Sequence, residues 1–355
     1  MELDWWGGNS AVLTALWSEA VPGSACYSIS MQVIVTGAAG FIGSHVVERL
    51  LARGDRVLGI DNFDPFYSPR EKRHNLASAL RHRNFQLREL DLADAPALQA
   101  TLEQASCDVI VHLAAKAGVR PSIQDPLGYA RANIVATQAL LEEAERQKVR
   151  RFVFASSSSV YGNSAAVPFS EDDPAVEPIS PYAATKRAGE LLCFTHQRLY
   201  GGSMLCLRFF TVYGPRQRPD LAIRKFATLM TSGRPIQLFG DGNTERDYTW
   251  IDDIVTGVLG AIDRTGSVPD EYQVVNLGGS RVTSLARLVV LLSEAFEIEP
   301  VIERLPPQPG DVERTWADVA KAERLLGYRP TTPIEEGIPR FAAWFNSGVA
   351  DLSRR

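Results

Sequence analysis

A glycine-rich turn constrains the fold of this chain more than any other feature of its sequence. The aliphatic run 32–36 leads directly into GAAGFIG at 37–43, and an amphipathic segment with Gly54 just past its end follows. Gly37 and Gly40 are expected to let backbone N–H groups approach a pyrophosphate, because no side chain blocks the way, and Gly43 to let the helix pack closely on the strand. The turn therefore predicts a βαβ unit that binds a dinucleotide.

A carboxylate follows the second expected strand, 56–60. Asp61 stands 24 residues after Gly37, where an acid accepts hydrogen bonds from the adenosine ribose and would repel a 2′-phosphate. This position favours NAD over NADP. An ordinary tight turn with a surface Asp would explain the same residues, but the strand-turn-helix-strand context argues against it.

Short aliphatic runs alternate with longer amphipathic ones along most of the chain. This alternation predicts an α/β fold with a Rossmann-type, doubly wound parallel sheet that helices cover on both faces. After about residue 210 the connections become rich in Pro and Gly, which indicates a smaller C-terminal substrate-binding domain. The strands are expected at 32–36, 56–60, 85–89, 108–113, 151–155 and 203–209.

The same pattern predicts how the chain is divided. We expect a poorly ordered N-terminal extension at 1–30, with either Met1 or Met31 as the true start. The further segments are an NAD-binding domain at 31–211 to which 249–278 returns, a substrate-binding domain made of 212–248 and 279–346, and a tail at 347–355.

Charge, cysteines and histidines favour a small molecule as the ligand. The formal net charge is −5 at pH 7, whereas attraction to nucleic acid or anionic lipid requires an excess of Lys and Arg. We interpret the basic stretch 70–83 as a solvated helix face. The four cysteines form no CxxC pair, the five histidines form no HExxH motif, and no apolar run is long enough to cross a membrane. We therefore expect a cytoplasmic protein without metal, nucleic-acid partner or membrane partner.

A tyrosine and a lysine are expected to share one face of a helix. Ser180 and Pro181 are typical of a helix start, and Tyr182 and Lys186 follow four residues apart. Tyrosine, with an ordinary pKa of about 10, is a poor base at neutral pH, but an adjacent ammonium and a cationic nicotinamide ring both favour the phenolate. Tyr182 would then accept a proton from a hydroxyl group. Any helix can carry Tyr-x-x-x-Lys by chance, so the motif indicates catalysis only together with other site residues.

A run of four serines is a candidate partner for this motif. Residues 156–159 follow the expected strand 151–155, at the carboxyl end of the sheet where ligands of α/β proteins bind. One of these hydroxyls can bridge Tyr182 and a substrate oxygen. A plain polar turn is the alternative interpretation.

With these motifs in order, the chain resembles the extended short-chain dehydrogenase/reductases that modify sugar nucleotides. The resemblance covers nearly all of 31–345 and is greatest to the UDP-glucuronate 4-epimerases. The segments that carry it are DNF (61–63), AGVR (117–120), SSSSVYG (156–162), YAATK (182–186), RFFTVYGPRQRPD (208–220) and FGDGNTERDYTWIDDI (239–254).

The resemblance implies a role for individual residues. Ser157, Tyr182 and Lys186 would be catalytic. Arg218 would bind the sugar carboxylate through two parallel hydrogen bonds, although a surface arginine is the alternative. The family usually has Gln where Lys116 stands. NAD would be held by Gly37, Gly40, Phe41, Ile42, Gly43, Asp61, Asn62, Asp91, Leu92, Leu113, Ala114, Ala115, Lys116, Asn133, Phe209, Tyr182 and Lys186, and the UDP-sugar by Ser158, Ser159, Thr211, Arg218, Arg246 and Asp311.

The implied activity is NAD-dependent 4-epimerisation of UDP-glucuronate to UDP-galacturonate through a 4-keto intermediate. UDP-glucose or UDP-N-acetylglucosamine 4-epimerase is an alternative. A decarboxylase would carry Glu at the position of Ser159, and a 4,6-dehydratase an acidic pair at Ser158 and Ser159. A non-catalytic NAD sensor would be expected to lack Tyr182 or Lys186. Helices at 126–147 and 181–199 would pair two chains as a homodimer.

Overall fold

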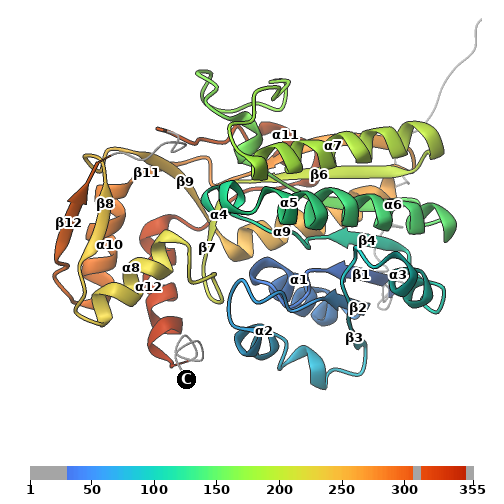
Figure 1. Cartoon of the computed structure of the whole chain (residues 1–355), viewed down its shortest axis with the longest axis horizontal. Helices are drawn as coiled ribbons and strands as arrows, with labels where there is room; N and C mark the ends of the chain where they lie inside the picture. The colour runs from blue at the N-terminus through green and yellow to red at the C-terminus, as the bar shows by residue number, and fades with distance from the viewer. Residues whose placement is uncertain (1–29, 307–312, 349–355) are drawn as a thin grey trace, which may run out of the picture. The chain divides into compact units, whose positions relative to one another are not determined.

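Seven parallel strands form the central sheet in the described part of the chain, which in this computed structural model comprises residues 30–306 and 313–348 (Figure 1). The strand order is β10-β6-β5-β4-β1-β2-β3, so the chain starts in the middle and reverses direction beside β1, which confirms the Rossmann-type fold. The strands are β1 (Gln32–Thr36), β2 (Arg56–Asp61), β3 (Phe85–Glu89), β4 (Val109–His112), β5 (Arg151–Ser157), β6 (Ser203–Phe209) and β10 (Glu271–Leu277).

Alternating strand residues face two separate hydrophobic layers. Val33 and Val35 of β1 belong to one buried cluster, with α1 (Phe41–Arg53) and α9 (Ile251–Ser267) packed on it. Ile34, between them, belongs to the other cluster. Since both faces are covered, the central strands β1 and β4 are mostly aliphatic, whereas the edge strand β3 is partly polar and exposed. The second face is covered by α3 (Ala95–Leu102), α6 (Ala136–Arg146) and α7 (Pro181–Tyr200).

One expected helix is interrupted. The segment 126–147 forms α5 (Pro126–Ala130), a π-helical turn (Arg131–Val135) and then α6. The Asn133 side chain in this turn donates to the backbone oxygen of Lys116 (2.9 Å). Because a π turn changes the direction of its side chains relative to a regular helix, the interruption fits this inward bond. Two short helices belong to the connections after strands: α2 (Pro69–Asn75) follows β2, and α4 (Val119–Gln124) follows β4.

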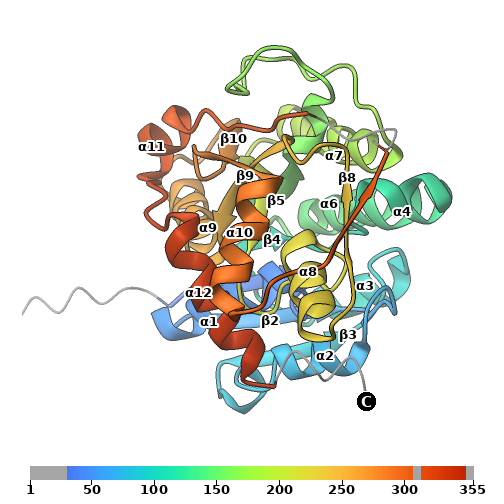
Figure 2. The same cartoon turned by 90° about the vertical axis from the view of Figure 1, so that its left-hand side faces the viewer.

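A smaller group of elements lies beside the carboxyl ends of the sheet strands, at the left of Figure 1 and toward the viewer in Figure 2. The described residues from Met31 onward form one compact unit, so the expected boundary between two domains stays a prediction. The group contains β7 (Thr211–Tyr213), β8 (Ile236–Phe239), β9 (Glu245–Trp250), β11 (Val282–Ser284), β12 (Ile302–Leu305), α8 (Ala222–Thr231), α10 (Leu285–Phe296) and α12 (Ile334–Asn346), and α11 (Ala320–Leu326) packs on α9.

Several expectations fall outside the described residues: nearly all of the N-terminal extension, most of the tail and the ribose contact of Asp311. Among the residues that are described, no helix has the length and apolarity needed to span a bilayer.

Candidate active site

The strands of the sheet end at one edge and open into a cavity of about 460 Å³. Register brings the ends together: Thr36 of β1 lies opposite Ile60 and His112, and Ser157 of β5 lies opposite Phe209. Residues expected at separate places in the chain therefore line one space. They are Gly37, Gly40, Phe41, Ile42, Gly43, Asp61, Asn62, Asp91, Leu92, Leu113, Ala114, Ala115, Lys116, Ser157, Ser158, Ser159, Tyr182, Lys186, Phe209, Thr211 and Arg218.

The glycine turn has the geometry that a dinucleotide requires. Gly37 has φ +69°, and a Cβ on it would lie 2.7 Å from the backbone nitrogen of Ala114. A Cβ on Gly43 would lie 2.0 Å from the carbonyl oxygen of Gly37. Gly40 precedes α1 without a side-chain cap, so the N-terminus of that helix faces the cavity with no side chain over it. The turn fits the pyrophosphate of NAD.

Asp61 is fixed at the end of β2. Its carboxylate accepts hydrogen bonds from the backbone nitrogens of Ala39 (3.0 Å) and Phe63 (2.8 Å). Burial raises the pKa of Asp61, while the nearby charge of Lys72 opposes this rise. A carboxylate has about four acceptor sites, so capacity for the ribose hydroxyls remains.

Other residues that are expected to hold NAD are positioned by side-chain hydrogen bonds. The side chain of Asn133 accepts from the backbone nitrogen of Lys116 (2.8 Å) and donates to the Thr185 hydroxyl (2.9 Å). Asn133 is not among the cavity-lining residues, so it supports the wall from behind. The Lys116 ammonium, where the family usually has Gln, donates to Asp125 (2.7 Å). Asp91 accepts from the Arg131 guanidinium (2.7 Å).

The start of α7 places the tyrosine and the lysine. The Ser180 hydroxyl accepts from the backbone nitrogen of Ala183 (3.1 Å), with Pro181 at the first helical position, which confirms the expected helix start. Lys186 is buried and donates to the carbonyl oxygen of Ala155 (2.7 Å) in β5. The Ser157 hydroxyl donates to that of Ser159 (3.1 Å) and lies close enough to Tyr182 to influence its pKa. Tyr182, Ser157 and Lys186 are therefore neighbours.

Burial has the largest effect on the protonation of this set in the protein alone. Burial raises the pKa of Tyr182 above its ordinary value, while the nearby Ser157 hydroxyl and the charge of Arg218 oppose this rise. Burial lowers the pKa of Lys186 to about 8, partly offset by Glu190. The protein alone thus favours the neutral phenol. Formation of the phenolate requires a further positive charge beside it, which is what an oxidised nicotinamide supplies.

Arg218 lies on the substrate side of the cavity but already has partners. Its guanidinium donates twice to Asp220 (3.0 and 2.6 Å) and once to the carbonyl oxygen of Ala117 (3.2 Å). It also lies over the Phe66 ring at 5.2 Å. A ligand carboxylate would have to share this guanidinium with Asp220. Arg246 does not line the cavity; its guanidinium donates to the carbonyl oxygens of Glu245 and Glu313.

Some residues that line the cavity were not predicted from the sequence. Phe66, Tyr67 and Lys72 from the segment after β2 line the cavity. Lys72 is only 7% exposed and donates to the carbonyl oxygen of Asp64 (2.8 Å), so the interpretation of 70–83 as a solvated face is wrong at this residue. A local pattern could not reveal this, because α2 is seven residues long and its burial depends on distant elements.

Comparison with known proteins agrees with this geometry. The model of the NAD dependent epimerase/dehydratase family matches residues 33–278. UDP-glucuronate 4-epimerase of Thermodesulfobacterium geofontis is 39% identical over 317 residues, which cover 89% of this chain and 96% of that protein. The structure of UDP-glucuronic acid 4-epimerase from Bacillus cereus, in complex with UDP-glucuronic acid and NAD, has a TM-score of 0.83 and 37% identity and covers 89% of this chain and 99% of that one.

The fold alone does not separate sugar substrates. UDP-glucose 4-epimerase of Thermotoga maritima, solved with UDP-glucose, has a TM-score of 0.80 and 33% identity and covers 90% of this chain and 100% of that one. The resemblance to extended short-chain dehydrogenase/reductases is confirmed, and the relatives that show it cover 89% of this chain. This chain belongs to the NAD dependent epimerase/dehydratase family.

Proposed function

We propose that this protein is an NAD-dependent 4-epimerase that converts UDP-glucuronate to UDP-galacturonate. One observation carries the proposal: Tyr182, Ser157 and Lys186 open into the same cavity as the glycine turn and Arg218. The cavity thus combines groups for a dinucleotide, for proton transfer and for an anionic sugar.

The residues have distinct tasks in this mechanism. Tyr182 accepts the proton of the sugar 4-hydroxyl, and Ser157, which lines the cavity beside Tyr182, orients that hydroxyl. Lys186 supplies positive charge beside the developing phenolate. NAD, held by the glycine turn and Asp61, would supply reversible hydride transfer at carbon 4 of the sugar. Inversion at carbon 4 would leave the cofactor oxidised at the end of each cycle, so the net reaction would be an isomerisation.

A uronate places a further demand on the site. Its 4-keto intermediate is a β-keto acid that can lose carbon dioxide, so an epimerase must hold the carboxylate in an orientation unsuited to that loss. Ser158, Ser159, Thr211 and Arg218 form the proposed clamp. We propose that 212–248 and 279–346 hold the UDP-sugar, and the support comes from the first segment, whose Arg218 and Leu221 line the cavity.

Incubation with UDP-glucuronate and NAD, followed by separation of the products, tests the activity. We expect UDP-galacturonate. A UDP-pentose would indicate the decarboxylase. If only UDP-glucose or UDP-N-acetylglucosamine is converted, the protein is a 4-epimerase of neutral sugars. If no sugar nucleotide is converted, the result would favour the non-catalytic NAD sensor.

Arg218→Ala tests the substrate. Loss of a charged hydrogen bond of about 1.5–3 kcal/mol predicts a roughly 10- to 150-fold lower kcat/KM for UDP-glucuronate. Any residual conversion of UDP-glucose should fall less than that of UDP-glucuronate, since UDP-glucose offers no carboxylate and loses only the effect of the Arg218 charge on Tyr182. Arg216→Ala is the control, because Arg216 lies on the same loop but pairs with Glu48 (2.8 Å) and does not line the cavity. Undiminished turnover of UDP-glucuronate by Arg218→Ala would remove the support for this substrate.

We propose that the protein is a homodimer paired through α4–α7. Support comes from apolar side chains exposed on these helices, with Leu127 83% exposed and Ile123 58% exposed. Exposed apolar side chains of this kind favour association. We also propose a cytoplasmic location, consistent with Cys107, Cys193 and Cys206, which are free thiols.

Leu127→Asp is expected to convert the dimer to a monomer in native mass spectrometry, because each dimer would bury two uncompensated carboxylates. Leu80→Asp, at a 52% exposed leucine between β2 and β3, should leave the dimer intact. A wild-type protein that is monomeric at micromolar concentration would refute the pairing.

A further inference from the structure

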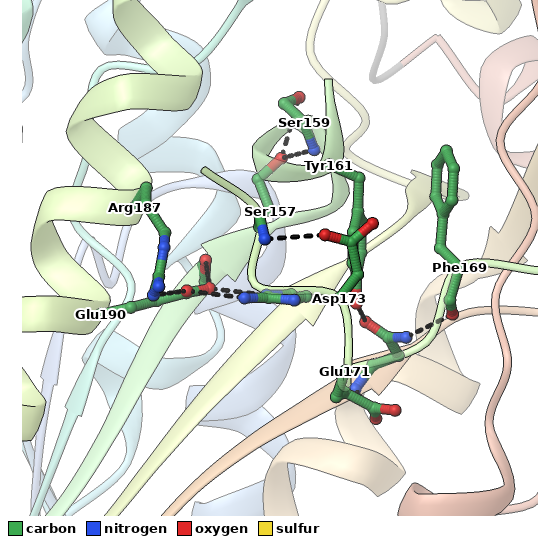
Figure 3. A network of polar contacts seen from close by, with 12 residues as sticks. Ser157, Ser159, Tyr161, Phe169, Glu171, Asp173, Arg187 and Glu190 are labelled. Carbon is green, nitrogen blue, oxygen red and sulfur yellow. Dashed lines mark hydrogen bonds and ion pairs between the residues drawn. The ribbon is translucent and has the colours of Figure 1, made fainter. Parts of the chain in front are cut away.

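A fully buried carboxylate lies one helical turn beyond Lys186. Glu190 of α7 is 0% exposed and has partners from three elements (Figure 3). It accepts from the Ser156 hydroxyl of β5 (2.6 Å) and from the Arg187 guanidinium (3.0 Å). Both of its oxygens also accept from the Arg208 guanidinium of β6 (2.8 and 2.9 Å).

These contacts join the elements that carry the catalytic set. Ser156 directly precedes Ser157, so its bond to Glu190 ties the end of β5 to α7, which carries Tyr182 and Lys186. The network continues beyond Glu190, because the Arg208 guanidinium lies over the Tyr161 ring at 4.6 Å. The Tyr161 hydroxyl in turn donates to Asn276 of β10 (2.7 Å).

The charges around Glu190 are unbalanced without it. Lys186 and Arg208 are both buried cations, at 4% and 2% exposed. Arginine does not lose its proton in proteins, whereas a buried lysine does so readily. Loss of the Glu190 charge would therefore favour loss of a proton from Lys186. Other titratable or charged groups near Lys186 or Glu190 are Tyr182, Arg187 and Cys193 on α7, His112 on β4, Cys206 on β6 and Tyr272 on β10.

We propose that Glu190 is a positioning residue for the reaction: its carboxylate keeps the Lys186 ammonium charged and holds the end of β5, with Ser157, against α7. It touches neither substrate nor cofactor. The inference rests on the proposed function for its effect on turnover, but its effect on Lys186 does not require any substrate.

Glu190→Gln provides the test because it keeps shape and removes charge. Burial already lowers the pKa of Lys186 to about 8, and Glu190 is the largest opposing influence. Removing a charge one helical turn away is expected to lower this pKa further, by roughly one pH unit. Lys186 loses its charge as pH rises, so the alkaline limb of the kcat profile should move to lower pH. Such a shift makes turnover at pH 8 roughly fivefold lower, beyond any loss that is constant with pH.

A direct readout separates this effect from general damage. In 13C NMR of lysine-labelled protein without substrate, the Lys186 signal, assigned by its absence in Lys186→Arg, should titrate at lower pH in Glu190→Gln. Glu190→Asp, which keeps the charge, should titrate near wild type even if its melting temperature falls. Asp253→Asn, which removes a buried carboxylate on α9 bonded to Thr331 and Thr332, should lower the melting temperature and leave the titration unchanged.

Arg187→Gln provides the opposite charge change in a side chain that is only partly buried. The substitution should raise the pH at which Lys186 titrates. If Glu190→Gln does not fold, this variant is the one used for the test. The proposal would be overturned if Lys186 in Glu190→Gln does not titrate at a lower pH than in wild type. If only Arg187→Gln folds, the proposal would be overturned when Lys186 in that variant does not titrate at a higher pH. Absence of turnover by the wild type would refute the proposed function and leave these titrations as the deciding measurement.

Discussion

Tyr182→Phe is expected to lower the epimerisation rate by roughly 10²- to 10⁴-fold, the usual contribution of a positioned acid-base group. The phenolic oxygen is the proposed acceptor of the 4-hydroxyl proton, and phenylalanine keeps the ring while removing that oxygen. Because Tyr182 lies at the cavity edge and its ring is retained, stability and NAD content should change little. Single-turnover reduction of bound NAD by UDP-glucuronate, followed at 340 nm, reports the affected step directly.

Tyr129→Phe is the matched control for this prediction. Its ring is perpendicular to that of Tyr182 at 6.3 Å, and its hydroxyl donates to the carbonyl oxygen of Ala117 (3.1 Å). It does not line the cavity, so its loss should cost about 1 kcal/mol of stability or less and leave the chemical step near wild type. Unchanged turnover by Tyr182→Phe would disprove the mechanism, whatever the sugar.

Patterns confined to short segments predicted most of the fold. The glycine turn, the positions of the strands and the start of α7 depend on neighbouring residues. The structure confirms the turn and the helix start and places the six expected strands within two residues of their expected ends, with β5 extending to Ser157. The interruption of 126–147 could not be read in this way. It is coupled to the bond between Asn133 and Lys116, 17 residues apart, and no helical periodicity reports such a contact.

The site shows the same division between local and distant effects. Tyr182 and Lys186 are recognisable because four residues make one helical turn. The raised pKa of Tyr182 and the burial of Lys72 result from packing by several elements. The pair of Glu190 and Arg208 joins α7 to β6; each residue alone resembles an ordinary surface charge in the sequence. Local motifs thus indicate which groups are candidates for the reaction, while the protonation of those groups depends on the assembled fold.

Gly43→Ala is expected to remove NAD binding and to destabilise the protein. The new Cβ would lie 2.0 Å from the carbonyl oxygen and 2.9 Å from the carbonyl carbon of Gly37. Both are backbone atoms, so the turn itself must move, and overpacking of this kind typically costs about 1–3 kcal/mol. The displaced turn is the one that faces the pyrophosphate, so the NAD content of the purified protein should fall to below about a tenth of that in wild type.

Gly54→Ala separates the loss of NAD from the loss of stability. Gly54 ends α1 at φ +97°, and its Cβ would meet no atom within 4 Å. An alanine there costs about 1–2 kcal/mol through backbone conformation alone. Both variants should therefore melt at lower temperature, but only Gly43→Ala should lose the cofactor. Equal NAD content in the two proteins would mean that the close approach of α1 to the turn is not what shapes the pyrophosphate site.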